Sequence, residues 1–70
     1  MKRYNIPERC KNLGITQTHL RAKTAEKTGS QIYPSDWSNY VSGNINSPKG
    51  EMVLAMADRL LTDLEARMRD

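Results

Sequence analysis

The chain has 70 residues, of which 37% are hydrophobic and 27% charged, and its formal net charge at neutral pH is +3. A single domain of this size buries only about 60% of the surface that its unfolded chain exposes, so its core must be small. No apolar run approaches the roughly 18–20 residues that cross a bilayer, and the first residues do not read as a secretory signal, so we expect a soluble, cytoplasmic protein.

Cys10 and His19 are the only cysteine and the only histidine. One cysteine cannot form an internal disulfide, and a zinc site needs three or four ligands, usually cysteine and histidine, so we expect no metal and no cofactor. No acid–base pair, nucleophile–base pair or phosphate-binding loop is visible, and we therefore do not expect an enzyme. The plain interpretation is that Cys10 is a small buried residue and His19 a surface residue of a first helical turn.

Positive charge is concentrated in the first two thirds of the chain. Residues 1–49 hold eight lysines and arginines against three acidic residues, a net charge of +5, whereas residues 50–70 hold three against five, a net charge of −2. A polyanionic partner should therefore meet the first two thirds.

Two short helices are predicted in the first thirty residues. The first covers about residues 7–13, because Pro7 suits the start of a helix and Gly14 supplies a left-handed stop. The second has Thr16 as its N-cap and ends before Gly29. Its apolar content is thin and consists of Leu20, Ala22 and Ala25.

The third predicted helix is brief and has one large anchor. Pro34 fits its first turn and Gly43 its end. Trp37 and Val41 are four residues apart and share one face, which Ile32 just upstream should join. We expect the indole to fasten this helix to the core and to leave the opposite face exposed.

That opposite face carries hydrogen-bonding groups with two interpretations. Ser35 can be an N-cap and Asp36 a favourable charge in the first turn, or both can contact a ligand. Asn39 is the stronger candidate for a contact, because capping does not call for asparagine in mid-helix. Tyr40 can pack at the edge of the core or donate its hydroxyl to a phosphate.

A long helix is expected from about Lys49 to Arg69, after Pro48. About 20 residues span roughly 30 Å, more than the rest of so small a domain easily covers. Either the end frays or the stripe beyond Leu61 meets a partner chain, and we expect the latter, a homodimer. We therefore place the domain core at about 7–61 and a dimerising extension at 62–70. The apolar stripe consists of Val53, Ala57, Leu60, Leu64 and Met68, widened by Met56 and Leu61.

Together these elements predict an all-α bundle of about four helices that contains a helix-turn-helix. In that arrangement the helix after the turn lies in the major groove, and its N-terminal residues reach the base edges. Asparagine pairs with adenine, serine can donate or accept, and a carboxylate accepts from the cytosine amine. Gln17, at the start of the preceding helix, would face a phosphate.

Three segments resemble the lambda-repressor and Cro-like helix-turn-helix domains of phage and prophage regulators. "GITQTHL" (14–20) is similar to the opening of that family's second helix, and "VLAMADRLL" (53–61) to the helix that closes its core. "IYPSDWSNYVSGNINSP" (32–48) follows the family's pattern of hydrophobic, Ser, Gly and Pro positions. The chain looks closest to short prophage-borne regulators of Gram-positive bacteria. Leu20 and Ile32 are about twice as far apart as is usual, so we expect an extended second helix or turn.

The resemblance implies sequence-specific binding of double-stranded DNA, typically as a dimer, by a transcriptional regulator such as a repressor or Cro-like protein. The alternative is a small helical module that binds or titrates a partner protein through its C-terminal helix. The base-facing candidates are Pro34, Ser35, Asp36 and Asn39, and the phosphate-facing candidates are Gln17, Asn44, Lys49 and, through its hydroxyl, Tyr40.

Overall fold

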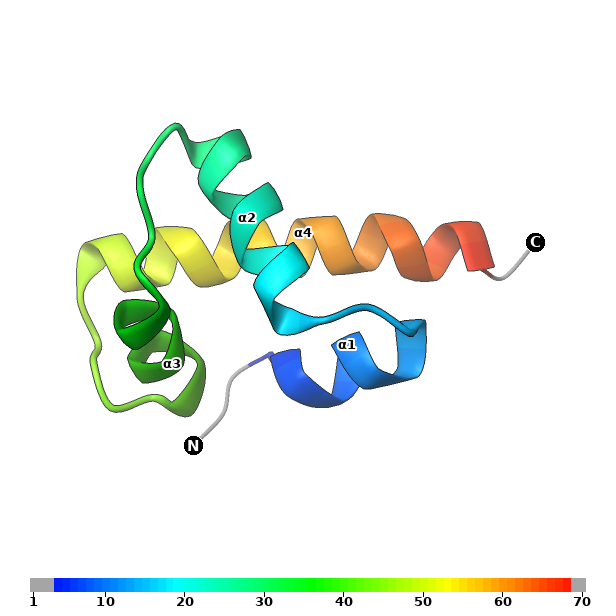
Figure 1. Cartoon of the computed structure of the whole chain (residues 1–70), viewed down its shortest axis with the longest axis horizontal. Helices are drawn as coiled ribbons and strands as arrows, with labels where there is room; N and C mark the ends of the chain where they lie inside the picture. The colour runs from blue at the N-terminus through cyan, green and yellow to red at the C-terminus, as the bar shows by residue number, and fades with distance from the viewer. Residues whose placement is uncertain (1–3, 69–70) are drawn as a thin grey trace.

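The computed structural model describes residues 4–68, which form four α-helices and contain no strand (Figure 1). The helices are α1 (Ile6–Leu13), α2 (Gln17–Thr28), α3 (Pro34–Ser42) and α4 (Pro48–Met68). The predicted all-α bundle is confirmed, and the observed starts lie within one residue of those expected. The predicted end of the last helix at Arg69 lies outside the described residues. No helix within 4–68 combines the length and apolar content that crossing a membrane requires.

The long helix α4 is the support on which the other three helices pack. In Figure 1 it runs across the whole view, with α3 beside its first half, α2 crossing its middle and α1 along its second half. The most extensive contact is between α2 and α4. Because α3 also contacts α2, it is held on two sides.

The helix ends are set by local signals that the sequence predicted. Gly14, Gly29 and Gly43 all adopt the left-handed conformation that ends a helix. At the N-terminus of α2 the Thr16 hydroxyl accepts a hydrogen bond from the backbone N–H of His19 at 3.1 Å. The three glycine ends and the Thr16 cap therefore satisfy backbone groups that the helical ladders leave unpaired.

The interpretation of Ser35 as an N-cap is wrong. The cap position of α3 is Tyr33, whose side chain makes no capping hydrogen bond, and Pro34 is the first helical residue. Proline lacks an N–H and has a φ already suited to a helix, so this helix can begin without a side-chain cap. Ser35 lies inside the first turn, and its exposed hydroxyl has no capping role.

The core confirms the predicted anchors. Trp37 is 5% exposed, and Cys10, Ile32 and Val41 are buried with it. Within residues 4–68 the buried apolar residues are Ile6, Cys10, Leu20, Ile32, Trp37, Tyr40, Val41, Val53, Leu54, Ala57 and Leu61.

The inner face of α2 differs from the prediction. Ala22 is exposed, and Thr24 takes the buried position one turn after Leu20. The Thr24 hydroxyl donates to the Leu20 carbonyl oxygen at 2.8 Å, so no polar atom is left unpaired by its burial. Threonine therefore behaves here as a β-branched apolar residue.

The stripe on α4 is rotated from the one expected. Val53, Leu54, Ala57 and Leu61 are buried, whereas Met68 is 64% exposed. Leu60 and Leu64 are only half-buried. The helix carries more apolar residues than one face can hold, and packing against α1, α2 and α3 decides which of them are covered.

Arg9 of α1 joins the second half of α4 through a hydrogen-bond network that was not predicted from the sequence. Its Nε and Nη2 donate to the two carboxylate oxygens of Glu65 at 3.0 and 2.8 Å, and its Nη1 donates to Asp58 at 2.7 Å. Nη2 also donates to the hydroxyl of Thr62. The bonds from Glu65 and Asp58 outweigh burial and raise the pKa of the guanidinium above its ordinary value.

This network bears on where the domain ends. Thr62 and Glu65 lie beyond the expected boundary at Leu61, and Ile6, before residue 7, is in the core. The second half of α4 is therefore used within the chain and is not simply a free extension.

The segment from Leu20 to Ile32 consists mostly of α2, which runs to Thr28, and of the connection 29–33. Arg21 holds this connection in place, since its Nη1 donates to the Ile32 carbonyl oxygen at 2.8 Å. The predicted end of the second helix before Gly29 is confirmed.

Candidate nucleic-acid interface

α3 has a buried side and a polar side. Trp37, Tyr40 and Val41 face the core. Ser35, Ser38, Asn39 and Ser42 recur at spacings of three, one and three residues, which places them on one face of a helix. The three serines are exposed and Asn39 is half-buried. We call these four residues the outer face of α3.

Asp36 lies beside the outer face in the first turn and is half-buried. Its carboxylate is close to the positive end of the helix dipole, as expected for a first-turn acid. Pro34 precedes it and is exposed. The start of α3 thus presents a proline ring, a hydroxyl and a carboxylate.

Gln17 ties the start of α2 to α3. Its Oε1 accepts a hydrogen bond from the indole Nε1 of Trp37 at 3.1 Å. Because the indole N–H is only a donor, the acceptor must be the amide oxygen, and the amide NH2 of Gln17 is left for another partner. Gln17, which was predicted to contact a phosphate, therefore also positions Trp37, the anchor of α3.

The segment after α3 is held by a Schellman turn. The backbone N–H groups of Gly43 and Asn44 donate to the carbonyl oxygens of Tyr40 and Asn39 at 3.2 and 3.0 Å. Gly43 has a φ of 85°, which an L-residue rarely adopts. The turn fixes the backbone of Asn44 directly after the outer face and leaves its side chain exposed.

Lys49 is brought near the entry to α3. Its Nζ donates to the carbonyl oxygen of Gln31 at 3.4 Å, linking the first turn of α4 to the connection before α3. The start of α4 is capped by Ser47, whose Oγ accepts from the Gly50 N–H at 3.0 Å. This cap was not predicted, although serine followed by proline is a usual helix start.

Tyr40 is placed in the core, in agreement with the packing interpretation. It is 7% exposed, and its ring lies against Gly50, where an added Cβ would be 2.8 Å from Cδ1. We therefore remove Tyr40 from the candidate DNA contacts. Its ring presses the middle of α3 onto the first turn of α4.

Of the predicted contacts, Pro34, Ser35, Asp36 and Asn39 come from α3 itself. Gln17 and Lys49 are tied by hydrogen bonds to α3 or to the connection before it. Ser38 and Ser42 were not predicted as part of this face, although their helical spacing from Ser35 places them on it.

The charge around the outer face is sparse. α3 contains no basic residue and one acidic residue, Asp36. Lys49 supplies a cation, while the guanidinium of Arg21 is engaged by the Ile32 carbonyl. Within 4–68, no three His, Cys, Asp or Glu side chains gather in a way that could hold a metal ion.

No protein-family model, curated protein or solved structure matches this chain. The case for a function therefore depends on the geometry of the site.

Proposed function

We propose that the protein binds double-stranded DNA sequence-specifically through the outer face of α3 and thereby regulates transcription. The observation that carries this proposal is the stripe of small polar residues at Ser35, Ser38, Asn39 and Ser42, opposite a side that Trp37 buries. A helix whose exposed face has short side chains can sit deeply in the major groove, which is wide enough for one α-helix.

The chemistry of this face suits base edges. The Asn39 amide can donate to and accept from adenine in a bidentate pair, and Ser35 can take either role. Asp36 can accept from the cytosine amine and would repel a phosphate, so it favours one register of the helix in the groove.

Phosphate contacts would fix the pose. The indole bonds to the amide oxygen of Gln17, so the amide NH2 can donate to a DNA phosphate from the start of α2. Asn44 and Lys49 would contribute from the other end of α3 and from the start of α4. These groups carry no sequence information themselves but hold α3 in register.

We also propose a homodimer, as the resemblance implies, with the exposed end of α4 at Met68 as the contact. Sedimentation of the free protein tests this, and the Met68→Glu variant should shift it toward the monomer. A chain truncated after Leu61 would not test the dimer alone, because it also lacks Glu65, the hydrogen-bond partner of Arg9. Unchanged sedimentation of Met68→Glu would place any dimer contact elsewhere.

The decisive experiment selects a preferred site from random duplex DNA and measures binding by fluorescence anisotropy. Asn39→Ala should weaken binding to that site by roughly 5- to 150-fold, equivalent to about 1–3 kcal/mol, and change binding to random duplex little. Asn12→Ala, at an exposed position of α1, is the matched control and should leave both unchanged. The affinity of the unmodified protein should also fall steeply with salt.

Two results would overturn the proposal. One is a selection that enriches no sequence and shows no salt-dependent binding. The other is an Asn39→Ala variant that folds normally by circular dichroism and binds the selected site as tightly as the unmodified protein.

A further inference from the structure

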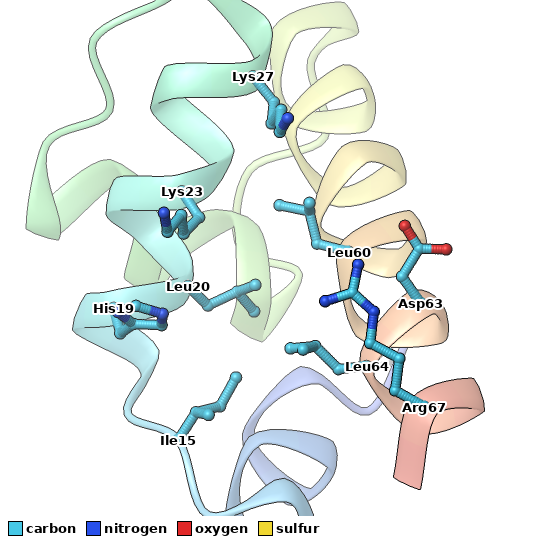
Figure 2. Close-up of a pocket in the computed structure, with 9 residues that line it drawn as sticks. All are labelled: Ile15, His19, Leu20, Lys23, Lys27, Leu60, Asp63, Leu64 and Arg67. Carbon is cyan, nitrogen blue, oxygen red and sulfur yellow. The ribbon is translucent and has the colours of Figure 1, made fainter. Parts of the chain in front are cut away.

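A groove between α2 and α4 lies outside the candidate DNA interface. Its volume is about 210 Å³, and none of its lining residues comes from α3 or the loops beside it. Figure 2 shows Leu20, Leu60, Leu64 and Ile15 directed into the space between the two helices. These four side chains form an apolar floor.

The rim of the groove is mainly positive. Lys23 and Lys27 stand one turn apart on α2, and Arg67 extends along the groove from α4 (Figure 2). All three are exposed, and Asp63 is the one carboxylate among the described residues that line the groove. The rim therefore adds a positive field to an apolar floor.

We propose that this groove binds an acidic amphipathic helix of a partner protein, which inserts one or two large apolar side chains between α2 and α4. The volume supports this occupant, since a cavity of about 150 Å³ already holds a molecule the size of benzene. An amphipathic helix supplies both parts of the match, apolar side chains for the floor and carboxylates on the next turns for Lys23, Lys27 and Arg67. Complementary charge also speeds the encounter and fixes the orientation.

DNA and a second copy of the chain fit this groove less well. A phosphate backbone could pair with the lysines but has nothing to place against four aliphatic side chains. An apolar side chain that a second copy could offer is Met68, which is exposed at the end of α4. Its neighbours in sequence, however, are Arg67 and Arg69. It would bring positive charge to a positive rim.

The probe is a fluorescein-labelled synthetic helix of about 14 residues with leucines at positions i and i+4 and glutamates on the adjoining turns, titrated with the full chain. Replacing its leucines by alanine should weaken binding by at least about tenfold, since burial of one leucine contributes about 1.5–3 kcal/mol. A third peptide with lysines for glutamates should not bind measurably.

Two charge variants of the protein distinguish a contact with the rim from a general effect of net charge. Lys23→Glu should weaken binding of the acidic peptide by roughly 2- to 30-fold, because it removes one exposed ion pair of about 0.2–1 kcal/mol and adds a repulsion of similar size. Lys11→Glu makes the same charge change at an exposed position of α1 that does not line the groove, and it should have a smaller effect. Asn39→Ala should leave peptide binding unchanged, so this proposal and DNA binding fail independently.

Amide chemical shifts locate the contact. The peptide should shift the resonances of Leu20, Leu60 and Leu64 and leave α3 unaffected. The proposal is overturned if the alanine peptide binds equally well or if the shifts fall on α3. It is also overturned if the same groove resonances move with protein concentration alone, which would assign the groove to a second copy, or with random duplex DNA, which would assign it to phosphates.

Discussion

Replacing Gly50 by alanine tests whether α3 is held against α4 by a close approach that only glycine allows. The ring of Tyr40 lies over Gly50, so an added Cβ would be 2.8 Å from Cδ1 and 3.1 Å from Cε1. Ordinary contact begins at 3.4 Å, and the ring would have to move by about 0.6 Å. Tyr40 is 7% exposed, so it has little free space into which to move.

Two opposing effects decide the sign of the change in stability. Alanine is favoured over glycine in a helix by up to about 1 kcal/mol, and without a clash it would stabilise α4. Forcing an extra methyl into a packed core costs about 1–3 kcal/mol. We expect Gly50→Ala to lower the free energy of unfolding by about 1 kcal/mol, which corresponds to a fall in Tm of about 4–8 °C for a domain of this size.

The assay is thermal and urea unfolding followed by circular dichroism, in two backgrounds. In the Tyr40→Leu background the ring is absent, so Gly50→Ala should be neutral or stabilising. The difference between the two backgrounds measures the coupling between the residues, which for groups in contact is about 0.5–3 kcal/mol. A Gly50→Ala variant that melts higher than the unmodified protein, or an identical change in both backgrounds, would refute the reasoning.

Two further predictions concern α1. Arg9→Met should lower the free energy of unfolding, measured in urea, by about 1–2 kcal/mol at low salt. The loss should be smaller at about 1 M salt, because the carboxylate partners of Arg9 are partly exposed and salt screens them. The control Lys11→Met, at an exposed position of α1, should change the free energy of unfolding little. An equal loss at both salt concentrations would show that packing of the arginine stem, not charge, dominates. Burial raises the pKa of the Cys10 thiol, so this thiol ionises at a lower pH in the unfolded chain than in the folded one. The free energy of unfolding should therefore fall as the pH rises past the ordinary thiol pKa of about 8.5. The thiol should react with a disulfide reagent only as fast as the protein unfolds, and rapid reaction of the folded protein would contradict its burial.

The helices and their ends follow from local sequence. Thr16 caps α2 and Gly43 ends α3 as predicted, because a cap depends only on residues within one turn of it. The role of Trp37 as an anchor was also predictable, since a single tryptophan on the apolar side of a short helix has few other positions available. The local signals misled at Ser35, because proline and serine both suit a helix start and the cap fell one residue before them, and the Ser47 cap of α4 was not predicted.

The orientation of α4 was not predictable in this way. Its sequence offers two overlapping apolar stripes, and a helix alone has no reason to prefer the one with Leu54 over the one with Met68. The choice depends on the side chains that α1, α2 and α3 place around it. For the same reason no periodicity could show that the ring of Tyr40 needs the absent side chain of Gly50.

Sequence by itself determined that this is a small helical domain with a short, polar-faced third helix, because propensity, capping and spacing act within a few residues. Tertiary structure alone decided that Arg9 reaches Glu65, 56 residues away, and that α2 and α4 leave an apolar groove with a basic rim. Both depend on where distant segments meet, and the residue pattern of one helix does not specify which segments pack against it.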